Sequence, residues 1–259
     1  MKHAWLVAAL LVGGCVTADV VAPEVVRDIA PTGTLRAAIN YGNPVLAQKS
    51  AIGEPGGVSV ELTRELGRRL GVPVTLVAYE AAGKVTGDAT SGKWDIAFVA
   101  RDPERAKDIE FTPPYVIIEG AYLVPANSPL QKNEDVDREG VRISVSRGSA
   151  YDLFLSRGVI KRATLVRAPS PPASVELFVH DKLEALAGVK QPLVAFAAAH
   201  PKYRVLPGRF MVIEQALAVP RGRPLAARYL NNFIDELKAS GFVAAALEKS
   251  GQRDAAVAP

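Results

Sequence analysis

The stretch Asp95–Tyr115, DIAFVARDPERAKDIEFTPPY, carries the pattern that decides the fold. Its first residues form a short apolar run, which is typical of a buried strand. Asp102 and Pro103 then begin a short helix, because Asp accepts hydrogen bonds from free backbone N–H groups and Pro fits the first turn. The proline pair that follows ends this helix, and the apolar run over residues 116–124 predicts a long strand.

The same order of strand, turn and helix is repeated on both sides of this stretch. Upstream, residues 34–39 predict a strand, and residues 58–70 predict a helix because apolar side chains recur there every four positions. Downstream, residues 141–145 predict a strand before a helix start at Ala150, and residues 210–219 form a second long strand. Alternating strands and helices indicate an α/β fold with mainly parallel sheets.

This ordered series resembles the family 3 extracellular solute-binding proteins, the amino-acid-type receptors of ABC importers. The stretch 95–115, the helix start GVSVEL at 57–62 and the turn VRISVSRGS at 141–149 carry the resemblance, which covers residues 32–252. No single motif is diagnostic, and the order of the segments is what is specific. The resemblance implies a two-lobed, type II periplasmic-binding-protein-like fold, with two mainly parallel sheets joined by two crossover strands.

The resemblance also implies a division of the chain and a function. Lobe 1 is expected to comprise residues 32–118 plus 214–255, and lobe 2 residues 119–213. A small organic acid or amino-acid-like ligand would be captured between the lobes by hinge closure and presented to an ABC permease in the inner membrane. We therefore expect a monomeric binding protein with no catalytic activity and no cofactor.

The N-terminus resembles an export signal. A positively charged start precedes an apolar run over residues 4–12, which is too short for a membrane span of about 20 residues. The next residues, LVGGC, resemble a bacterial lipobox, so residues 1–15 are predicted to be a signal peptide and Cys15 a lipid attachment site. The alternative is cleavage after Ala18, which would release a soluble protein. Both place the protein in the periplasm or cell envelope, with residues 16–31 as a tether.

Arg105 is the first candidate for ligand binding. A carboxylate entering a cleft loses water, and a guanidinium group replaces that water with paired donors that match both oxygens. Arg105 stands at the position of the carboxylate-binding arginine in the family that the chain resembles. The alternative is a surface helix residue paired with Glu104 or Asp108.

Loops after the strands supply further candidates. Tyr41 and Asn43 follow the first strand, and ligands of open α/β sheets lie beyond the carboxyl ends of strands. The alternative for Tyr41 is packing on its own lobe. Ser149 and Tyr151 follow a strand of lobe 2, where the Ser149 hydroxyl can bind a ligand, cap the next helix, or do both.

Two departures from the family pattern bear on the ligand. Ala100 stands where the family commonly has a Ser or Thr that binds the carboxylate, and Arg101 beside it offers a second positive charge. Val189 stands where amino-acid receptors have the Asp that holds the α-ammonium group, with Lys190 next to it. An ammonium group buried against Val189 would be unpaired and costly.

These departures predict that the ligand is not a common α-amino acid, unless another acid, Glu119 or Glu214, replaces the missing Asp. A carboxylate without the amine, or a dicarboxylate, fits a site with Arg105 and a second cation, Lys190 or Arg101. The alternative function is a cyclohexadienyl dehydratase-like enzyme on the same fold, which needs a proton donor such as Glu119, Glu214 or Lys190.

The charge distribution and the histidine positions argue against a nucleic-acid-binding protein and against a metal site. The net charge is +4, from 31 Lys and Arg against 27 Asp and Glu, and the positive residues are dispersed rather than gathered in the basic stripe typical of nucleic-acid binding. The histidines show no metal-ligand spacing, so no metal site is predicted. They are His3, His180 and His200.

Overall fold

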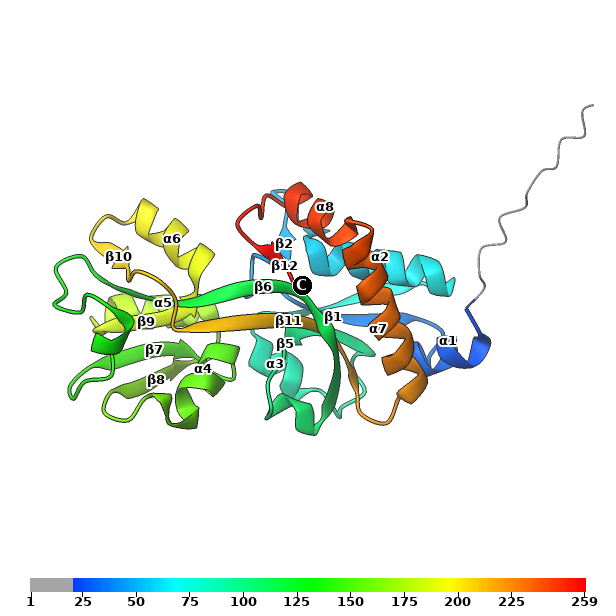
Figure 1. Ribbon diagram of the computed structural model, residues 1–259, viewed down its shortest axis with the longest axis horizontal. Helices are drawn as coiled ribbons and strands as arrows, with labels where there is room; N and C mark the ends of the chain where they lie inside the picture. Colours follow the sequence, from blue (N-terminus) through cyan, green and yellow to red (C-terminus); the bar gives the residue numbers. More distant parts are fainter. Residues whose placement is uncertain (1–20) are drawn as a thin grey trace, which may run out of the picture.

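The computed structural model describes residues 21–259, so the predicted signal peptide, Cys15 and residues 16–20 of the tether lie outside the described residues. The described chain forms two lobes side by side, and two long strands run across the middle between them (Figure 1). These strands are β6 (Ile109–Pro125) and β11 (Met211–Pro220). They confirm the long strands predicted over residues 116–124 and 210–219.

Lobe 1 is built on three parallel strands. β1 (Leu35–Asn40) lies between β4 (Val74–Tyr79) and β5 (Ile96–Ala100), and it pairs with both in parallel. β11 then pairs antiparallel with β5 and with β6. A small hairpin of β2 (Gln48–Lys49) and β3 (Pro55–Gly56) lies beside this sheet.

Lobe 2 repeats the arrangement. β7 (Arg142–Ser146) lies between β8 (Thr164–Ala168) and β9 (Ala185–Val189), in parallel with both, and β9 pairs antiparallel with β6. The two mainly parallel sheets joined by crossover strands are therefore confirmed. Because β6 and β11 also pair with each other, hydrogen bonds link the strands of both lobes in the continuous order β4-β1-β5-β11-β6-β9-β7-β8. β10 (Tyr203–Val205) and β12 (Ala256–Val257) pair with β6.

Helices cover both lobes (Figure 1). Lobe 1 carries α1 (Pro23–Ile29), α2 (Val58–Leu70), α3 (Ala82–Gly87), α7 (Pro224–Ala239) and α8 (Phe242–Lys249). Lobe 2 carries α4 (Ala150–Phe154), α5 (Pro171–His180) and α6 (Lys190–Ala199). Shorter turns are η1 (Arg105–Lys107), η2 (Asn133–Asp135) and the irregular η3 (Leu155–Val159).

The four-residue apolar spacing that predicted α2 places its buried face on lobe 1. Leu62, Leu66 and Leu70 are buried, and the helix ends at Gly71 in the left-handed conformation. Gly57 precedes the first turn with φ of +103°, and a Cβ there would lie 2.5 Å from the Leu46 carbonyl oxygen. Only glycine fits this close approach.

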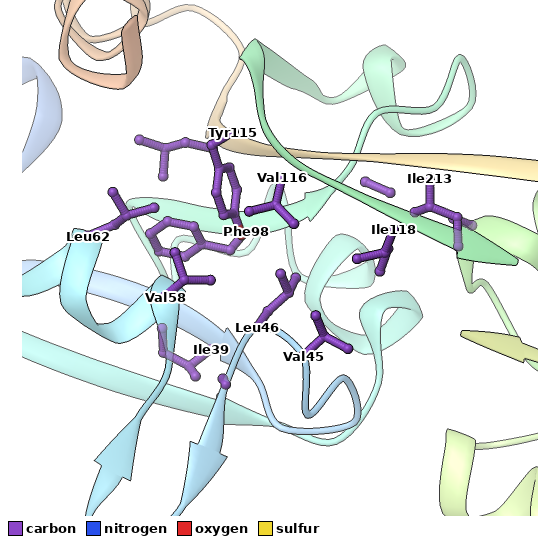
Figure 2. Close-up of a cluster of buried hydrophobic side chains, with 14 of the residues drawn as sticks. Ile39, Val45, Leu46, Val58, Leu62, Phe98, Tyr115, Val116, Ile118 and Ile213 are labelled. Atoms are coloured by element: carbon purple, nitrogen blue, oxygen red, sulfur yellow. The ribbon is translucent and has the colours of Figure 1, made fainter. Parts of the chain in front are cut away.

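The apolar core reaches from lobe 1 along the crossing strands (Figure 2). Tyr115 on β6 packs edge-on against Phe98 on β5, with ring centroids 5.9 Å apart, and its hydroxyl lies 3.3 Å from that of Ser59 on α2. Ile118 and Ile213 continue the core toward lobe 2. Burying each such side chain contributes about 1.5–3 kcal/mol, so the crossing strands are firmly held in lobe 1.

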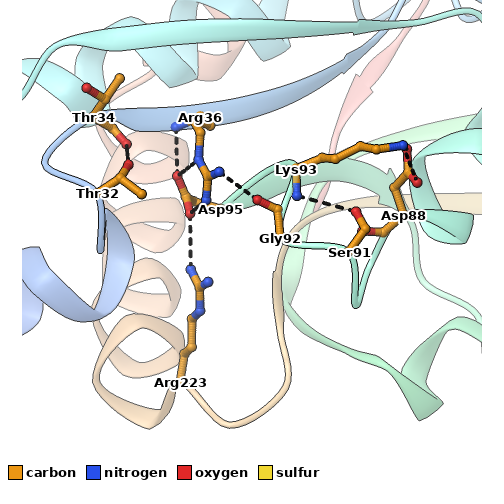
Figure 3. Close-up of polar contacts among 9 residues, drawn as sticks. All are labelled: Thr32, Thr34, Arg36, Asp88, Ser91, Gly92, Lys93, Asp95 and Arg223. Carbon is orange, nitrogen blue, oxygen red and sulfur yellow. Dashed lines mark hydrogen bonds and ion pairs between the residues drawn. The ribbon is translucent and has the colours of Figure 1, made fainter.

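A buried carboxylate fixes β5 against β1 (Figure 3). Asp95 is fully buried, and its Oδ1 lies 2.7 Å from Nη2 of Arg36, while Oδ2 accepts hydrogen bonds from Nε and the backbone N–H of the same residue. Arg223 at the start of α7 lies 3.5 Å from Oδ1. These paired charges satisfy a group that would be costly to bury alone, and they hold the strand whose far end reaches the site.

The predicted tether is wrong for residues 23–30. Pro23 begins helix α1, Ile29 and Ala30 are buried, and Oδ2 of Asp28 accepts a hydrogen bond from the backbone N–H of Ala226, at 2.8 Å. A carboxylate is stabilised at this position because the first N–H groups of α7 lack helical partners. The segment is therefore part of lobe 1.

Candidate functional site

A cavity of about 290 Å³ lies between the lobes, at the carboxyl ends of parallel strands from both. Ala100 ends β5, Ser146 ends β7 and Val189 ends β9, and each of them lines it. Ile213 and Gln215 of the crossing strand β11 line it as well. This is the position where open α/β sheets bind ligands.

Arg105 is the charged residue of the cavity. It is 5% exposed, its Nη1 donates to the carbonyl oxygen of Ala100 at 2.8 Å, and its Nη2 donates to that of Gly148 in lobe 2 at 2.9 Å. Its Nε is buried and has no hydrogen-bond partner among the residues described. The alternative of a surface residue is wrong, because the side chain is buried and Glu104 pairs with Lys107 instead.

Burial lowers the pKa of Arg105 to about 10, with the nearby Asp102 acting in the opposite direction. A group with that pKa is still protonated at neutral pH, so the cavity contains a positive charge. The Asp102 carboxylate pairs with Arg157, at 2.5 Å, rather than with Arg105. Arg105 therefore brings to the cavity wall a positive charge and a buried N–H that has no partner among the described residues.

The loop after β1 reaches the cavity as predicted. Tyr41 and Asn43 both line it, and Oδ1 of Asn43 accepts a hydrogen bond from the backbone N–H of Val45, at 3.3 Å. Burial raises the pKa of Tyr41, and Nζ of Lys49 lies 5.0 Å from its ring centroid. The ring therefore both packs on lobe 1 and forms part of the cavity wall.

Ser149 and Tyr151 bring hydroxyl groups from lobe 2. Ser149 caps α4, since its Oγ accepts a hydrogen bond from the backbone N–H of Asp152 at 3.0 Å, and it also lines the cavity. Tyr151 lines it beside Ser149, and burial raises the pKa of its phenol to about 12. That phenol keeps its proton at neutral pH and can act as a donor.

Three predicted site residues do not line this cavity. Arg101 is half exposed and pairs with Glu214 at 3.2 Å. Lys190, the first residue of α6, places its Nζ 2.7 Å from Oε2 of Glu119, while Arg209 lies 2.7 Å from Oε1. Hydrogen bonds from Lys190 and Arg209 hold the pKa of Glu119 below its usual range. Neither Arg101 nor Lys190 therefore brings a second positive charge to the lining of this cavity.

Sequence reasoning missed part of the lobe 2 wall. Pro171 and Pro172 form the first turn of α5 after the cap Ser170, and both line the cavity. Val175 of the same helix and Leu193 of α6 join them. The signal was present, because Ser followed by Pro is a typical helix start.

The lobes touch at one edge of the cavity. Gly83 of α3 faces Gly148 of lobe 2, and a Cβ on Gly148 would lie 2.9 Å from Cα of Gly83. A Cβ on Gly83 would lie 2.6 Å from the Arg147 carbonyl oxygen. With the Arg105–Gly148 hydrogen bond, this backbone contact closes that edge.

The sequence model of the bacterial extracellular solute-binding proteins, family 3, matches residues 35–252. The chain therefore belongs to this family, as the resemblance predicted. No curated protein sequence matches it significantly.

Solved structures of similar fold agree with this assignment. The solute receptor for L-cysteine of Neisseria gonorrhoeae is 25% identical, with a TM-score of 0.76, and the match covers 87% of this chain and 92% of that one. A mutant of ArgBP from T. maritima is 22% identical over 88% and 99% of the two chains, with a TM-score of 0.75. The ancestral amino-acid-binding protein AncCDT-1, described as a precursor of cyclohexadienyl dehydratase, is 22% identical over 86% and 98%, with a TM-score of 0.73.

None of the helices within residues 21–259 has the length and apolar character needed to cross a membrane. Within the same range, no three His, Cys, Asp or Glu side chains are grouped so that they could hold a metal ion.

Proposed function

We propose that the protein is the substrate-binding component of an ABC-type importer and captures a small carboxylate-bearing solute between its lobes by hinge closure. The buried Arg105 carries the proposal, because its Nε lacks a partner among the described residues and it lines a cavity between the lobes. A ligand carboxylate would supply the missing acceptor and a counter-charge in one step. The importer role rests on the family and on relatives such as an amino acid ABC transporter substrate-binding protein from Streptococcus pneumoniae.

The ligand we propose is not a common α-amino acid. Val189 lines the cavity at the end of β9, and no Asp or Glu is among the described residues that line it. An α-ammonium group there would be buried without a counter-charge, which is costly. Glu119 does not replace the missing acid, since Lys190 and Arg209 already bind both of its oxygens.

The same observation disfavours the dehydratase alternative. A dehydratase needs an acid or a lysine within reach of its substrate, and the three candidates Glu119, Glu214 and Lys190 are each engaged in an ion pair away from the main cavity. The related ancestral protein is itself described as amino-acid-binding. Capture without chemical change is the function that the site supports.

We propose that the hinge of this closure lies in the crossing strands. The lobe boundaries expected at residues 118/119 and 213/214 fall within β6 and β11. We further propose a monomer exported to the periplasm and attached to the cell envelope through Cys15. Mass spectrometry of the mature protein should find an acylated N-terminal Cys15, and an unmodified N-terminus at Asp19 would contradict the anchor.

Thermal unfolding with a broad panel of small carboxylates, each paired with its amide, tests the proposed capture. Binding at a ligand concentration of 100 Kd stabilises a protein by about 2.7 kcal/mol, so a true ligand raises the Tm clearly. We expect shifts with carboxylates and none with amides. The radius of gyration from small-angle X-ray scattering should be smaller with the ligand than without it. Equal shifts with acids and amides, or no shift with any acid, would overturn the proposal.

A further inference from the structure

The charge content of the cavity limits its ligand further. Arg105 is the only Asp, Glu, Lys, Arg or His among the described residues that line it. The two lining phenols, Tyr41 and Tyr151, both have raised pKa values and are neutral at pH 7. The cavity therefore offers one positive charge and no negative charge to anything enclosed in it.

A second charge on the ligand would lack compensation. A second carboxylate would require a second cation, but Lys190 is bound by Glu119 and Arg101 by Glu214, and neither lines the cavity. An ammonium group would find neutral acceptors at best. Several of these are already used: Oδ1 of Asn40 accepts from the Gly42 N–H at 3.0 Å, and Oγ of Ser149 accepts from the Asp152 N–H. Unpaired charges in such a site are strongly disfavoured.

The wall contributed by α5, β9 and α6 of lobe 2 is mainly apolar. Its polar side chain is Ser174, whose Oγ donates a hydrogen bond to the Pro171 carbonyl oxygen, and its larger apolar side chains are Pro171, Pro172, Val175, Val189, Pro192 and Leu193. Contact with such a wall favours aliphatic or aromatic groups by roughly 25 cal/mol per Å² of apolar surface removed from water. A ligand whose charged end lies at Arg105 would bring its other end against these residues, since they belong to the opposite lobe.

We infer that the ligand is a monocarboxylate with an uncharged, mainly apolar body, such as a branched aliphatic or aryl-substituted acid. This inference rests on the proposed function, because it takes a carboxylate at Arg105 as given. It excludes dicarboxylates, which the sequence had left open. The cavity, about 290 Å³, is at the small end of the range for ligand pockets, which suits a small acid of this class.

Two matched ligand series test the inference by calorimetry on the wild-type protein. The first is 3-phenylpropanoate, phenylalanine, benzylmalonate and 3-phenylpropanamide. The second is 4-methylpentanoate, leucine, isobutylmalonate and 4-methylpentanamide. Within each series the body is constant, while an ammonium or a second carboxylate is added, or the charge is removed. Glycerate, a monocarboxylate with a polar body, completes the set.

We expect the monocarboxylate of at least one series to bind at least about tenfold more tightly than its amino, malonate and amide counterparts and than glycerate. An amino acid, a malonate or glycerate that binds as tightly overturns the inference and leaves carboxylate capture intact. An amide that equals its acid, or a failure of all acids to bind, overturns the proposed function as well. The two failures are thus distinguishable.

A pair of variants locates the apolar contact. Val175→Thr replaces one methyl group of the cavity wall by a hydroxyl at constant shape, and it should weaken binding of the better acid by about fivefold to tenfold. Val194→Thr makes the same change on α6 at a residue that is half exposed and does not line the cavity, and it should leave binding unchanged. Equal effects of the two variants, or none from Val175→Thr, contradict the contact.

Discussion

The two walls of the cleft are alike in topology and differ in charge. Each is built at the ends of three parallel strands. Lobe 1 presents the guanidinium of Arg105 and the amides of Asn40 and Asn43 beside the rings of Tyr41 and Phe98, whereas lobe 2 presents mainly prolines and aliphatic side chains with a few hydroxyl groups. Some of those hydroxyls are already used within lobe 2, as when Oγ of Ser174 donates to the Pro171 carbonyl oxygen.

This difference corresponds to two separate roles in ligand binding, one for each wall. In the proposed function, the charged wall provides the interaction that a carboxylate needs, and the apolar wall selects among carboxylates by the body they carry. If so, substitutions in the two walls have different signatures: those in lobe 1 change whether an acid binds, and those in lobe 2 change which acid binds.

The largest effect is expected from Arg105→Met, which removes the charge of the lobe 1 wall. Breaking a buried charge pair costs about 3–5 kcal/mol, so affinity for the carboxylate ligand should fall by at least about a hundredfold in calorimetry. Arg101→Met is the matched control, since Arg101 is nearby, exposed and outside the cavity, and it should change affinity less than about twofold. A urea transition confirms that both variants fold. Wild-type affinity in Arg105→Met would contradict the asymmetry of the walls.

Val189→Asp tests the difference between the two walls, because it adds an acidic side chain to the wall of lobe 2. A carboxylate at the end of β9 supplies the counter-charge that an α-ammonium group lacks. We expect leucine or phenylalanine to gain at least about tenfold over its deaminated counterpart, measured as the ratio of the two Kd values. Val189→Asn introduces polarity without charge and should not reverse the ratio. An unchanged ratio in Val189→Asp would mean that the ligand does not approach this residue.

Gly148→Ala tests how closely the walls must approach. The new Cβ would lie 2.9 Å from Cα of Gly83, so the lobes must separate, and affinity should fall by about tenfold. Gly148 has φ of +68°, and Ala there adds about 1–2 kcal/mol of backbone strain. Gly140→Ala has the same strain, at φ of +82°, but nothing lies within 4 Å of its Cβ. Loss of affinity in both variants would assign the effect to strain rather than to the contact.

The smallest effect on binding is expected from Glu119→Gln, because the Glu119–Lys190 pair lies outside the cavity. Hydrogen bonds from Lys190 and Arg209 hold the pKa of Glu119 below its unfolded value of about 4.3. The pair therefore stabilises the fold above that value, and the contribution is lost as the pH falls through the lower, folded pKa. Between pH 7 and pH 3 the wild type should lose more stability than Glu119→Gln, while affinity at pH 7 stays within about twofold. A large loss of affinity would place Lys190 in the site after all.

Local sequence patterns predicted most of the strands and helices. They also predicted that the site lies at the carboxyl ends of strands. Ser149 follows a turn signal directly after a strand, so its place at a strand end could be predicted from the residues, whereas Arg105 was assigned to the cleft by the family resemblance. The ion pairs of Lys190 and Arg101 could not be predicted, because Glu119 and Glu214 are distant in the sequence and become neighbours only through the crossing strands. Helix α1 was missed for a related reason: so short a helix is marginal alone, and packing against lobe 1 stabilises it.

The contact between Gly83 and Gly148 has a consequence for how the ligand preference of such a cleft can evolve. Because neither residue has a side chain, the spacing of the lobes at that edge is fixed by main chain alone. The chemistry of the cavity resides in other positions, and those positions can be exchanged without moving the point where the lobes meet. The same backbone frame can therefore be adapted to a different cargo by a few substitutions on one wall.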